Sequence, residues 1–183
     1  PDHVEMMEWL CAAKIGGDAN IGKGIYTHFL DDEGMVRADF TAFRMADRIR
    51  MVNGADAGPR DYHYMRRVAQ DKGFDVTITD VAEKFVTIGI WGPNARVNLA
   101  KVVEDPDGLS KENFPFAAIK PVRIAGKDVS AFRISYVGEQ GWELHMAYED
   151  GLAVWDTLRG AGVMAVGVET YANSRRLEKS LRL

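Results

Sequence analysis

The stretch Ile134-Ser-Tyr-Val-Gly-Glu-Gln-Gly-Trp-Glu-Leu144 decides how the second half of the chain is expected to fold. Two glycines enclose a short polar turn, and the segments 128–136 and 142–146 on either side alternate between apolar and polar residues. A short glycine-containing loop between two such segments predicts a β-hairpin. Glycine also permits close backbone approach or positive φ. The turn thus presents one carboxylate, Glu139, either as an ordinary polar turn residue or as an acid directed at a ligand.

Hydrophobic periodicity extends this interpretation to the rest of the chain. The expected helices are 2–13, 60–72, 93–103, 149–161 and a last one from 170 onward. The further expected strands are 25–30, 35–45, 48–53, 74–79, 84–91, 119–124 and 163–168. Because helices and strands do not alternate strictly, the pattern favours the α+β class, in two mixed units with a boundary near residue 80.

Composition restricts the possible functions. The 183 residues carry a formal net charge of −4, which gives no indication of nucleic-acid binding, and no apolar run approaches a membrane span of ~18 residues. There is no signal-peptide pattern. The single cysteine, Cys11, excludes an internal disulfide and fits a reducing compartment, either the cytoplasm or the mitochondrial matrix. Its apolar neighbours favour a buried small residue over a reactive thiol.

The sequence does not support a metal site or a phosphate-binding loop. None of the four histidines has a second ligand type at metal spacing, so we expect no metal site. The stretch from Gly17 to Gly24 imitates a phosphate-binding loop, but Gly24 stands where that motif requires Ser or Thr after the lysine. We therefore interpret this stretch as a connector.

Asp39 is the most conspicuous acid of the first half. It lies in the expected strand 35–45, on the polar face with Arg37 and Thr41. Aspartate is disfavoured in strands, so its presence needs a reason. It is either a solvated surface residue or a buried or cleft carboxylate that meets a cationic or basic nitrogen.

Five stretches, in the same order along the chain, resemble the folate-binding aminomethyltransferase family. This family includes the glycine-cleavage T-protein and the C-terminal parts of dimethylglycine and sarcosine dehydrogenases. The stretches are Gly34-Met-Val-Arg-Ala-Asp39, Trp91-Gly-Pro-Asn-Ala-Arg96, Asn113-Phe-Pro-Phe116, Tyr136-Val-Gly-Glu-Gln-Gly-Trp-Glu-Leu144 and Ser174-Arg-Arg-Leu-Glu178. Together they span most of the sequence.

The resemblance implies a fold of two strand-helix subdomains, 1–80 and 81–165, with 166–183 as a helix that returns to the first subdomain and is truncated. In the family a strand precedes the first helix and a β-barrel follows the last one. We therefore expect the chain to be a fragment that lacks both.

The resemblance also implies site residues. Asp39 matches the catalytic carboxylate that contacts the reacting nitrogens of tetrahydrofolate. Tyr26, Asn53, Glu139, Trp142 and Arg176 match positions near the bound folate. Tyr26 is equally consistent with core packing, Asn53 with an ordinary turn residue, and Arg176 with a helix salt bridge. Arg175 and Asn173 depart from the family pattern in the last helix, and the single acid at Asp39 favours the dehydrogenase branch.

The implied function is tetrahydrofolate-dependent transfer of a one-carbon unit from a methylamine-type donor, although the fragment itself can be inactive. In the dehydrogenase branch a separate flavin domain makes the reactive imine. This chain carries no flavin fingerprint, so FAD is expected only in a parent domain outside it. The alternatives are a folate-dependent demethylase, a folate-binding protein of iron–sulfur maintenance without transferase activity, and a remnant that binds nothing. We expect neither nucleic acid nor a membrane as partner.

Overall fold

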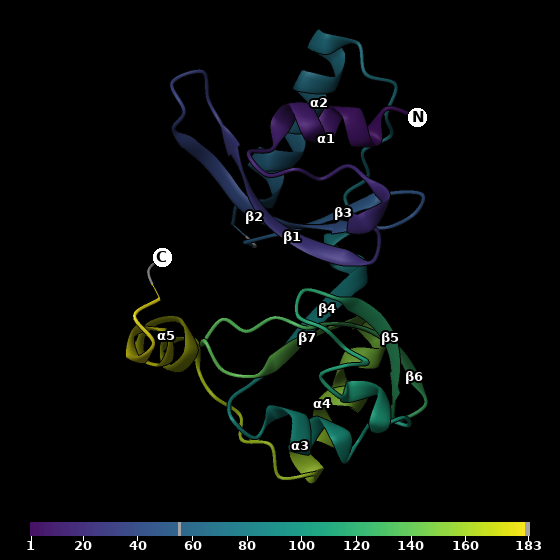
Figure 1. The fold of residues 1–183 in the computed structure, drawn as a ribbon, viewed down its shortest axis with the longest axis vertical. Helices are drawn as coiled ribbons and strands as arrows, with labels where there is room; N and C mark the ends of the chain where they lie inside the picture. Colours follow the sequence, from purple (N-terminus) through teal and green to yellow (C-terminus); the bar gives the residue numbers. More distant parts are fainter. Residues whose placement is uncertain (55, 182–183) are drawn as a thin grey trace. The chain divides into compact units, whose positions relative to one another are not determined.

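A computed structural model describes residues 1–54 and 56–181 of the chain. The chain divides into two compact units, Pro1–Asp80 (unit 1) and Val81–Leu183 (unit 2), and each has its own hydrophobic core. The described residues form two antiparallel sheets together with helices (Figure 1), so the α+β class is confirmed. The finer division, with 166–183 returning to the first subdomain, stays a prediction.

Unit 1 is a three-stranded sheet covered on one face by two helices (Figure 1). Its strands are β1 (Lys23–Leu30), β2 (Val36–Arg44) and β3 (Ile49–Asn53), and its helices are α1 (His3–Leu10) and α2 (Gly58–Lys72). Alternate residues of β2 face the helices, where Ala38, Phe40 and Ala42 are buried. This alternation is the predicted one, and it places Asp39 on the other face.

Turn chemistry sets the ends of these elements. Asp31 begins the turn between β1 and β2, and its Oδ1 accepts hydrogen bonds from the backbone N–H groups of Glu33 and Met35. The turn closes at Gly34, whose φ of 81° is left-handed. Pro59 stands in the first turn of α2, and Gly73 ends that helix at φ 75°. The predicted hairpin and helix are confirmed here.

The predicted strand 74–79 is wrong. Phe74, Val76 and Ile78 pack against the core of unit 1 and alternate as a strand would. The segment is not part of any described strand ladder. The N–H of Phe74 donates to the carbonyl of Ala69 in α2, and the N–H of Asp75 donates to the Asp2 carboxylate at 2.8 Å. Periodicity reports which side chains are buried, whereas a strand also needs a neighbour to pair with.

Cys11 is half-buried beside β1. Burial raises the pKa of its thiol to about 12; a hydrogen bond with Thr27 works in the opposite direction, and the charge of Glu8 adds to the rise. A thiol that stays protonated is a poor nucleophile. Cys11 also packs, partly buried, against the core of unit 1, which agrees with its interpretation as a small packing residue.

Unit 2 is built on a four-stranded antiparallel sheet of order β4-β7-β6-β5. The strands are β4 (Phe85–Trp91), β5 (Ile119–Ile124), β6 (Lys127–Phe132) and β7 (Gly141–Ala147), and the helices are α3 (Ala95–Ala100) and α4 (Gly151–Gly160). One face of the sheet, with Trp142 and Leu144 fully buried, forms a core with Leu99 of α3 and Val154 of α4. The stretch 134–144 therefore contributes to β7, one of the two inner strands of this sheet.

The predicted hairpin exists, but its loop is longer than expected. Strands β6 and β7 pair with Phe132 opposite Glu143, so residues 133–140 all belong to the connection. Arg133 exchanges backbone hydrogen bonds with residues 117 and 118 instead of extending the ladder. The carbonyl of Gln140 accepts a hydrogen bond from the N–H of Gly92 at 2.8 Å, which holds the far end of the loop to the end of β4.

The last part of unit 2 differs more from expectation. No strand forms over 163–168, where Met164, Val166 and Val168 are largely exposed. The expected terminal helix is a π-helix, Thr170–Arg175, followed by the short α5, Arg176–Glu178. The part of that expected helix at 182–183 lies outside the described residues.

Candidate functional site

Asp39 lies on the outer face of β2 in unit 1, directly across from His28 of β1. The phenol of Tyr26 donates a hydrogen bond to the Oδ2 atom of Asp39 at 3.1 Å. The Tyr26 ring also meets the His28 ring edge-on, with centroids 5.1 Å apart. The sheet thereby brings together two of the predicted site residues and holds the carboxylate in one orientation.

The environment of this pair is open. Asp39 is exposed, and the Tyr26 side chain is 57% exposed. Within unit 1 the buried setting expected for Asp39 is therefore absent, because the flanking residues on its face of β2 are polar. Asp39 lies on a surface, where a cationic group can reach it without a large desolvation cost.

Asn53 is not brought beside Asp39. It pairs with Phe40, so the register places it on the face of the sheet that packs against the helices. Its amide donates to Oδ2 of Asp61 at 2.9 Å, and Asp61 is only 2% exposed. Asn53 thus satisfies a buried carboxylate of α2, a structural role that the sequence did not indicate.

Glu139 belongs to the loop 133–140 of unit 2. Its Oε1 atom lies 2.7 Å from the ammonium of Lys179, and the two side chains are 33% and 45% exposed. Lys179 also lies on Gly138, whose φ is 69°. A Cβ at that glycine would stand 2.9 Å from Cγ of Lys179, so both this contact and the positive φ favour glycine there. The acid is accessible, but a lysine of the same unit partly neutralises it.

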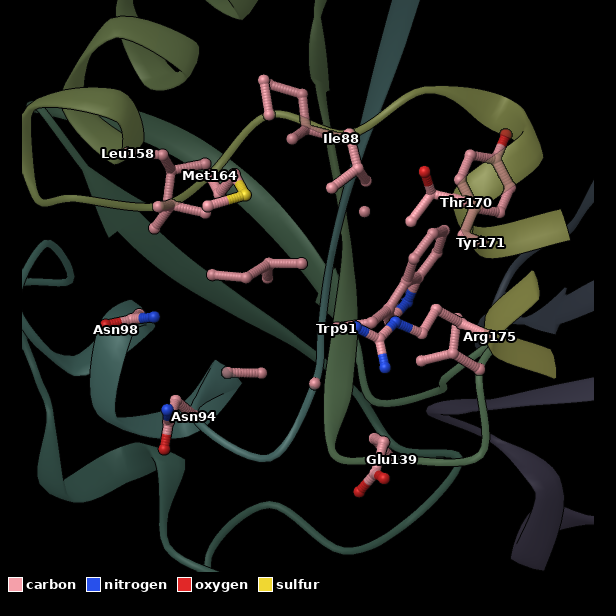
Figure 2. A pocket seen from close by; sticks show the side chains of 18 of the residues that line it. Ile88, Trp91, Asn94, Asn98, Glu139, Leu158, Met164, Thr170, Tyr171 and Arg175 are labelled. Atoms are coloured by element: carbon pink, nitrogen blue, oxygen red, sulfur yellow. The ribbon is translucent and has the colours of Figure 1, made fainter. Parts of the chain in front are cut away.

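A large cavity of about 1050 Å³ in unit 2 includes Glu139 in its wall (Figure 2). Trp91 and Tyr171 stack at a tilt with ring centroids 5.2 Å apart, and Tyr136 meets Tyr171 edge-on at 5.7 Å. In Figure 2, Trp91, Tyr171 and Arg175 lie on one side, with Asn94 and Asn98 on the other and Glu139 at one end. Within 1–54 and 56–181 the buried indole N–H of Trp91 has no hydrogen-bond partner.

The π-helix Thr170–Arg175 supplies part of this wall, namely Tyr171 and Arg175. A π-helical turn is uncommon and often occurs at functional sites, because it displaces side chains from their α-helical positions. Arg176 does not line the cavity as Arg175 does. Its guanidinium donates to the backbone carbonyls of Ala172 and Leu181, the latter at 2.7 Å, so it caps its own chain end.

Trp142 has a different place from the one that the resemblance implies. Its side chain is fully buried in the core of unit 2. The ring of Phe114 meets it edge-on at 6.0 Å, and the guanidinium carbons of Arg96 and Arg133 lie 6.0 and 5.8 Å from its centroid. Because Trp142 is buried, no surface of its side chain is open to a ligand. Trp142 can therefore affect ligand binding only by supporting the loop 133–140, which it follows in the chain.

A family model described as the GCVT N-terminal domain matches residues 1–183, the whole chain. The chain belongs to this family. The match confirms the resemblance to the folate-binding aminomethyltransferase family, which includes the T-protein and parts of the dimethylglycine and sarcosine dehydrogenases.

This GCVT domain has relatives among dimethylglycine and sarcosine dehydrogenases, a 4-methylaminobutanoate oxidase and aminomethyltransferases. It is 32% identical over 186 residues to rat mitochondrial dimethylglycine dehydrogenase, a match that covers 99% of this chain and 21% of that protein. It is 28% identical to an aminomethyltransferase of Thermus thermophilus, covering 98% of this chain and 50% of that protein. The chain therefore spans between a fifth and a half of the length of these relatives.

A solved structure shows the same fold. The crystal structure of the glycine cleavage system aminomethyltransferase T from Bartonella henselae aligns with a TM-score of 0.78 and 24% identity. The alignment covers all of this chain and 47% of that one. At this identity the likeness supports the fold of the GCVT domain and nothing finer.

Sequence reasoning missed several residues that the GCVT fold brings together. Trp91 lies at the end of a strand, and Tyr171 and Arg175 lie in a segment expected to be an ordinary helix. The available signal was a tryptophan directly before Gly92-Pro93, where the chain must turn.

Among residues 1–54 and 56–181 no group of three His, Cys, Asp or Glu side chains could hold a metal ion. In the same part of the chain no helix has the length and apolar character to cross a membrane.

Proposed function

We propose that this chain is the tetrahydrofolate-binding part of an enzyme that transfers a one-carbon unit from an aminomethyl or iminium donor. The observation that carries the proposal is the Tyr26–Asp39 hydrogen bond on the sheet of unit 1, in a chain that matches the GCVT family over its whole length. A carboxylate oriented by a neutral donor suits a step in which positive charge or a mobile proton appears.

The residues present fit a reduced pteridine in chemical character. The cavity of unit 2 offers aromatic surface at Trp91 and Tyr171 and amides at Asn94 and Asn98. An amide can both donate and accept, which suits the mixed edge of a pterin. The buried Trp91 N–H, without a partner among the described residues, is a donor that a ligand acceptor would satisfy.

When bound, tetrahydrofolate supplies the nucleophilic nitrogen for the one-carbon unit. Asp39 holds negative charge at a fixed point of β2, and Tyr26 keeps that carboxylate in one rotamer. Glu139 would anchor the pterin once Lys179 releases it. Arg176 and Trp142 would contribute by holding the chain end and the loop, and Asn53 by fixing α2 through Asp61. Proximity of donor and acceptor supplies the remaining acceleration.

Within this function we propose the dimethylglycine or sarcosine dehydrogenase branch. Mouse sarcosine dehydrogenase is 32% identical over 175 residues, against 28% for the Thermus aminomethyltransferase. The donor would then be a methylamine-type small molecule, and FAD would be held by a domain outside this chain.

Two measurements test the proposal. Isothermal titration of the chain with tetrahydrofolate should show saturable binding. The parent protein, given a methylated amine, should form methylenetetrahydrofolate when folate is present and formaldehyde when it is absent. Absence of folate binding in the parent protein would refute the proposal.

The alternatives give other results. Binding without turnover on any methylated donor would indicate the non-catalytic folate-binding protein. Turnover of sulfonium or methoxy donors with no activity on amines would indicate a demethylase.

A further inference from the structure

Unit 1 has a cavity of its own, about 560 Å³ in volume, between the β1–β2 hairpin and α2. Its wall includes Arg37 of β2 and Arg60, His63, Tyr64 and Arg67 of α2. Three guanidinium groups thus gather around one small cavity in a chain whose net charge is −4. The volume lies in the range of small-molecule sites.

Two of these arginines rest on the same aromatic ring. The guanidinium carbon of Arg37 lies 5.0 Å from the centroid of Tyr64, and that of Arg67 lies 5.7 Å from it. The two side chains come from different elements, so the ring holds a strand residue and a helix residue near one another. Neither arginine has a recorded ion pair within residues 1–54 and 56–181.

The two acids that line this cavity, Asp31 and Asp61, already accept hydrogen bonds from neighbouring groups. Buried Asp61 accepts from Arg60 Nε at 2.8 Å and from Asn53 at 2.9 Å. The hydrogen bond and the charge of Asp61 raise the pKa of Arg60. Asp31 accepts two backbone N–H groups in its turn. The acids therefore hold Arg60 and the hairpin, while Arg37 and Arg67 line the cavity and are exposed.

We propose that this cavity binds a small oxyanion, the carboxylate or phosphate group of a small molecule, between Arg37 and Arg67. A guanidinium is a planar fork of donors that matches either group with two parallel hydrogen bonds. Stacking on Tyr64 orders both forks before binding, which lowers the entropy lost when a ligand arrives. The proposal does not depend on the folate function.

Titration of the folded chain with inorganic phosphate and, separately, with glutarate tests it, with ionic strength held constant by sodium chloride. We expect saturable binding of at least one of the two anions. Phosphate binding alone would identify a phosphate-bearing ligand, and glutarate binding alone a carboxylate-bearing one. Arg37→Gln and Arg67→Gln should each weaken binding roughly tenfold, as expected for loss of a charge-assisted hydrogen bond.

Arg66→Gln is the matched control. Arg66 is the helix neighbour of Arg67 and has the same charge, but it lies over Tyr62, 5.6 Å from that centroid, and does not line the cavity. It should leave the affinity unchanged within about twofold, since only a screened surface charge is lost. Equal weakening by all three variants, or no saturable binding of either anion, would overturn the proposal. Circular dichroism verifies that each variant is folded, as expected for exposed side chains.

Discussion

The two carboxylates predicted as site residues, Asp39 in unit 1 and Glu139 in unit 2, are held in opposite ways. Asp39 lies within β2, where it pairs with His28 of β1, and a neutral phenol orients it. Glu139 lies in a loop, and a lysine ammonium at 2.7 Å neutralises it. The strand acid is held by a hydrogen bond from a neutral group, whereas the loop acid must exchange one partner for another. The first arrangement suits catalysis and the second suits reversible binding.

Replacing Asp39 tests the catalytic half of this comparison and should have the largest effect. In the parent enzyme, Asp39→Asn should slow one-carbon transfer about 10²–10⁴-fold, the usual contribution of acid–base help, because the amide is isosteric but uncharged. Folate affinity by titration should change little. Asp32→Asn, in the exposed β1–β2 turn, is the matched control. Equal losses in rate and affinity would contradict the assigned role.

Removing Trp142 tests whether unit 2 needs its loop anchored from the core. Trp142→Ala should destabilise unit 2 by about 3–5 kcal/mol, as expected for loss of a fully buried tryptophan. Denaturant unfolding measures this. Trp155→Ala, at a residue that is 41% exposed in the same unit, should cost less. A folded and stable Trp142→Ala chain that has lost only folate binding would instead favour direct ligand contact.

Tyr26→Phe asks whether the orientation of Asp39 matters. The change removes one exposed hydrogen bond, so the expected cost is about 1 kcal/mol, or roughly fivefold in transfer rate. Single-turnover kinetics of the parent enzyme separates this from a change in folate binding. Tyr148→Phe, at a residue that is 69% exposed in unit 2, should have no effect. A rate unchanged in Tyr26→Phe would show that Asp39 needs no partner.

Releasing Glu139 should have the smallest effect. The pair with Lys179 is partly exposed, and such pairs contribute at most about 1 kcal/mol. Lys179→Met should therefore strengthen tetrahydrofolate binding by at most about fivefold, and Lys179→Arg should leave it unchanged. Titration at low and high salt provides an independent check, since salt screens the pair. Weaker binding in Lys179→Met would mean that the lysine positions Glu139 instead of competing for it.

Much of the fold could be predicted because its signals are local. Pro59 and Gly73 mark the ends of α2, and Asp31 with Gly34 marks the first hairpin. Segments such as 74–79 failed because burial of alternate side chains does not supply a pairing partner. The prediction of a strand over 163–168 was also wrong, because apolar residues alone do not make a strand without a neighbouring strand to pair with.

The site residues also divide into those that a local pattern places and those that only register or packing places. The motif that carries Asp39 places it on the outer face of its strand, as alternation requires. That Asn53 faces α2 follows from the register of β3, which no local pattern encodes. Trp142 could be recognised as part of a motif, but only the folded sheet shows that its side chain is enclosed in the core.

The sequence by itself determined the family, the α+β class and the polar face that carries Asp39, because motif wording and residue periodicity are properties of neighbouring positions along the chain. Tertiary structure alone decided that Tyr26 orients Asp39, that Lys179 pairs with Glu139, and that Arg37 and Arg67 share Tyr64. The contacts Tyr26–Asp39, Lys179–Glu139 and Arg37–Tyr64 join residues from different elements, whereas Arg67 and Tyr64 are neighbours on α2. Their distances depend on strand register and helix placement, which arise from packing of the whole unit.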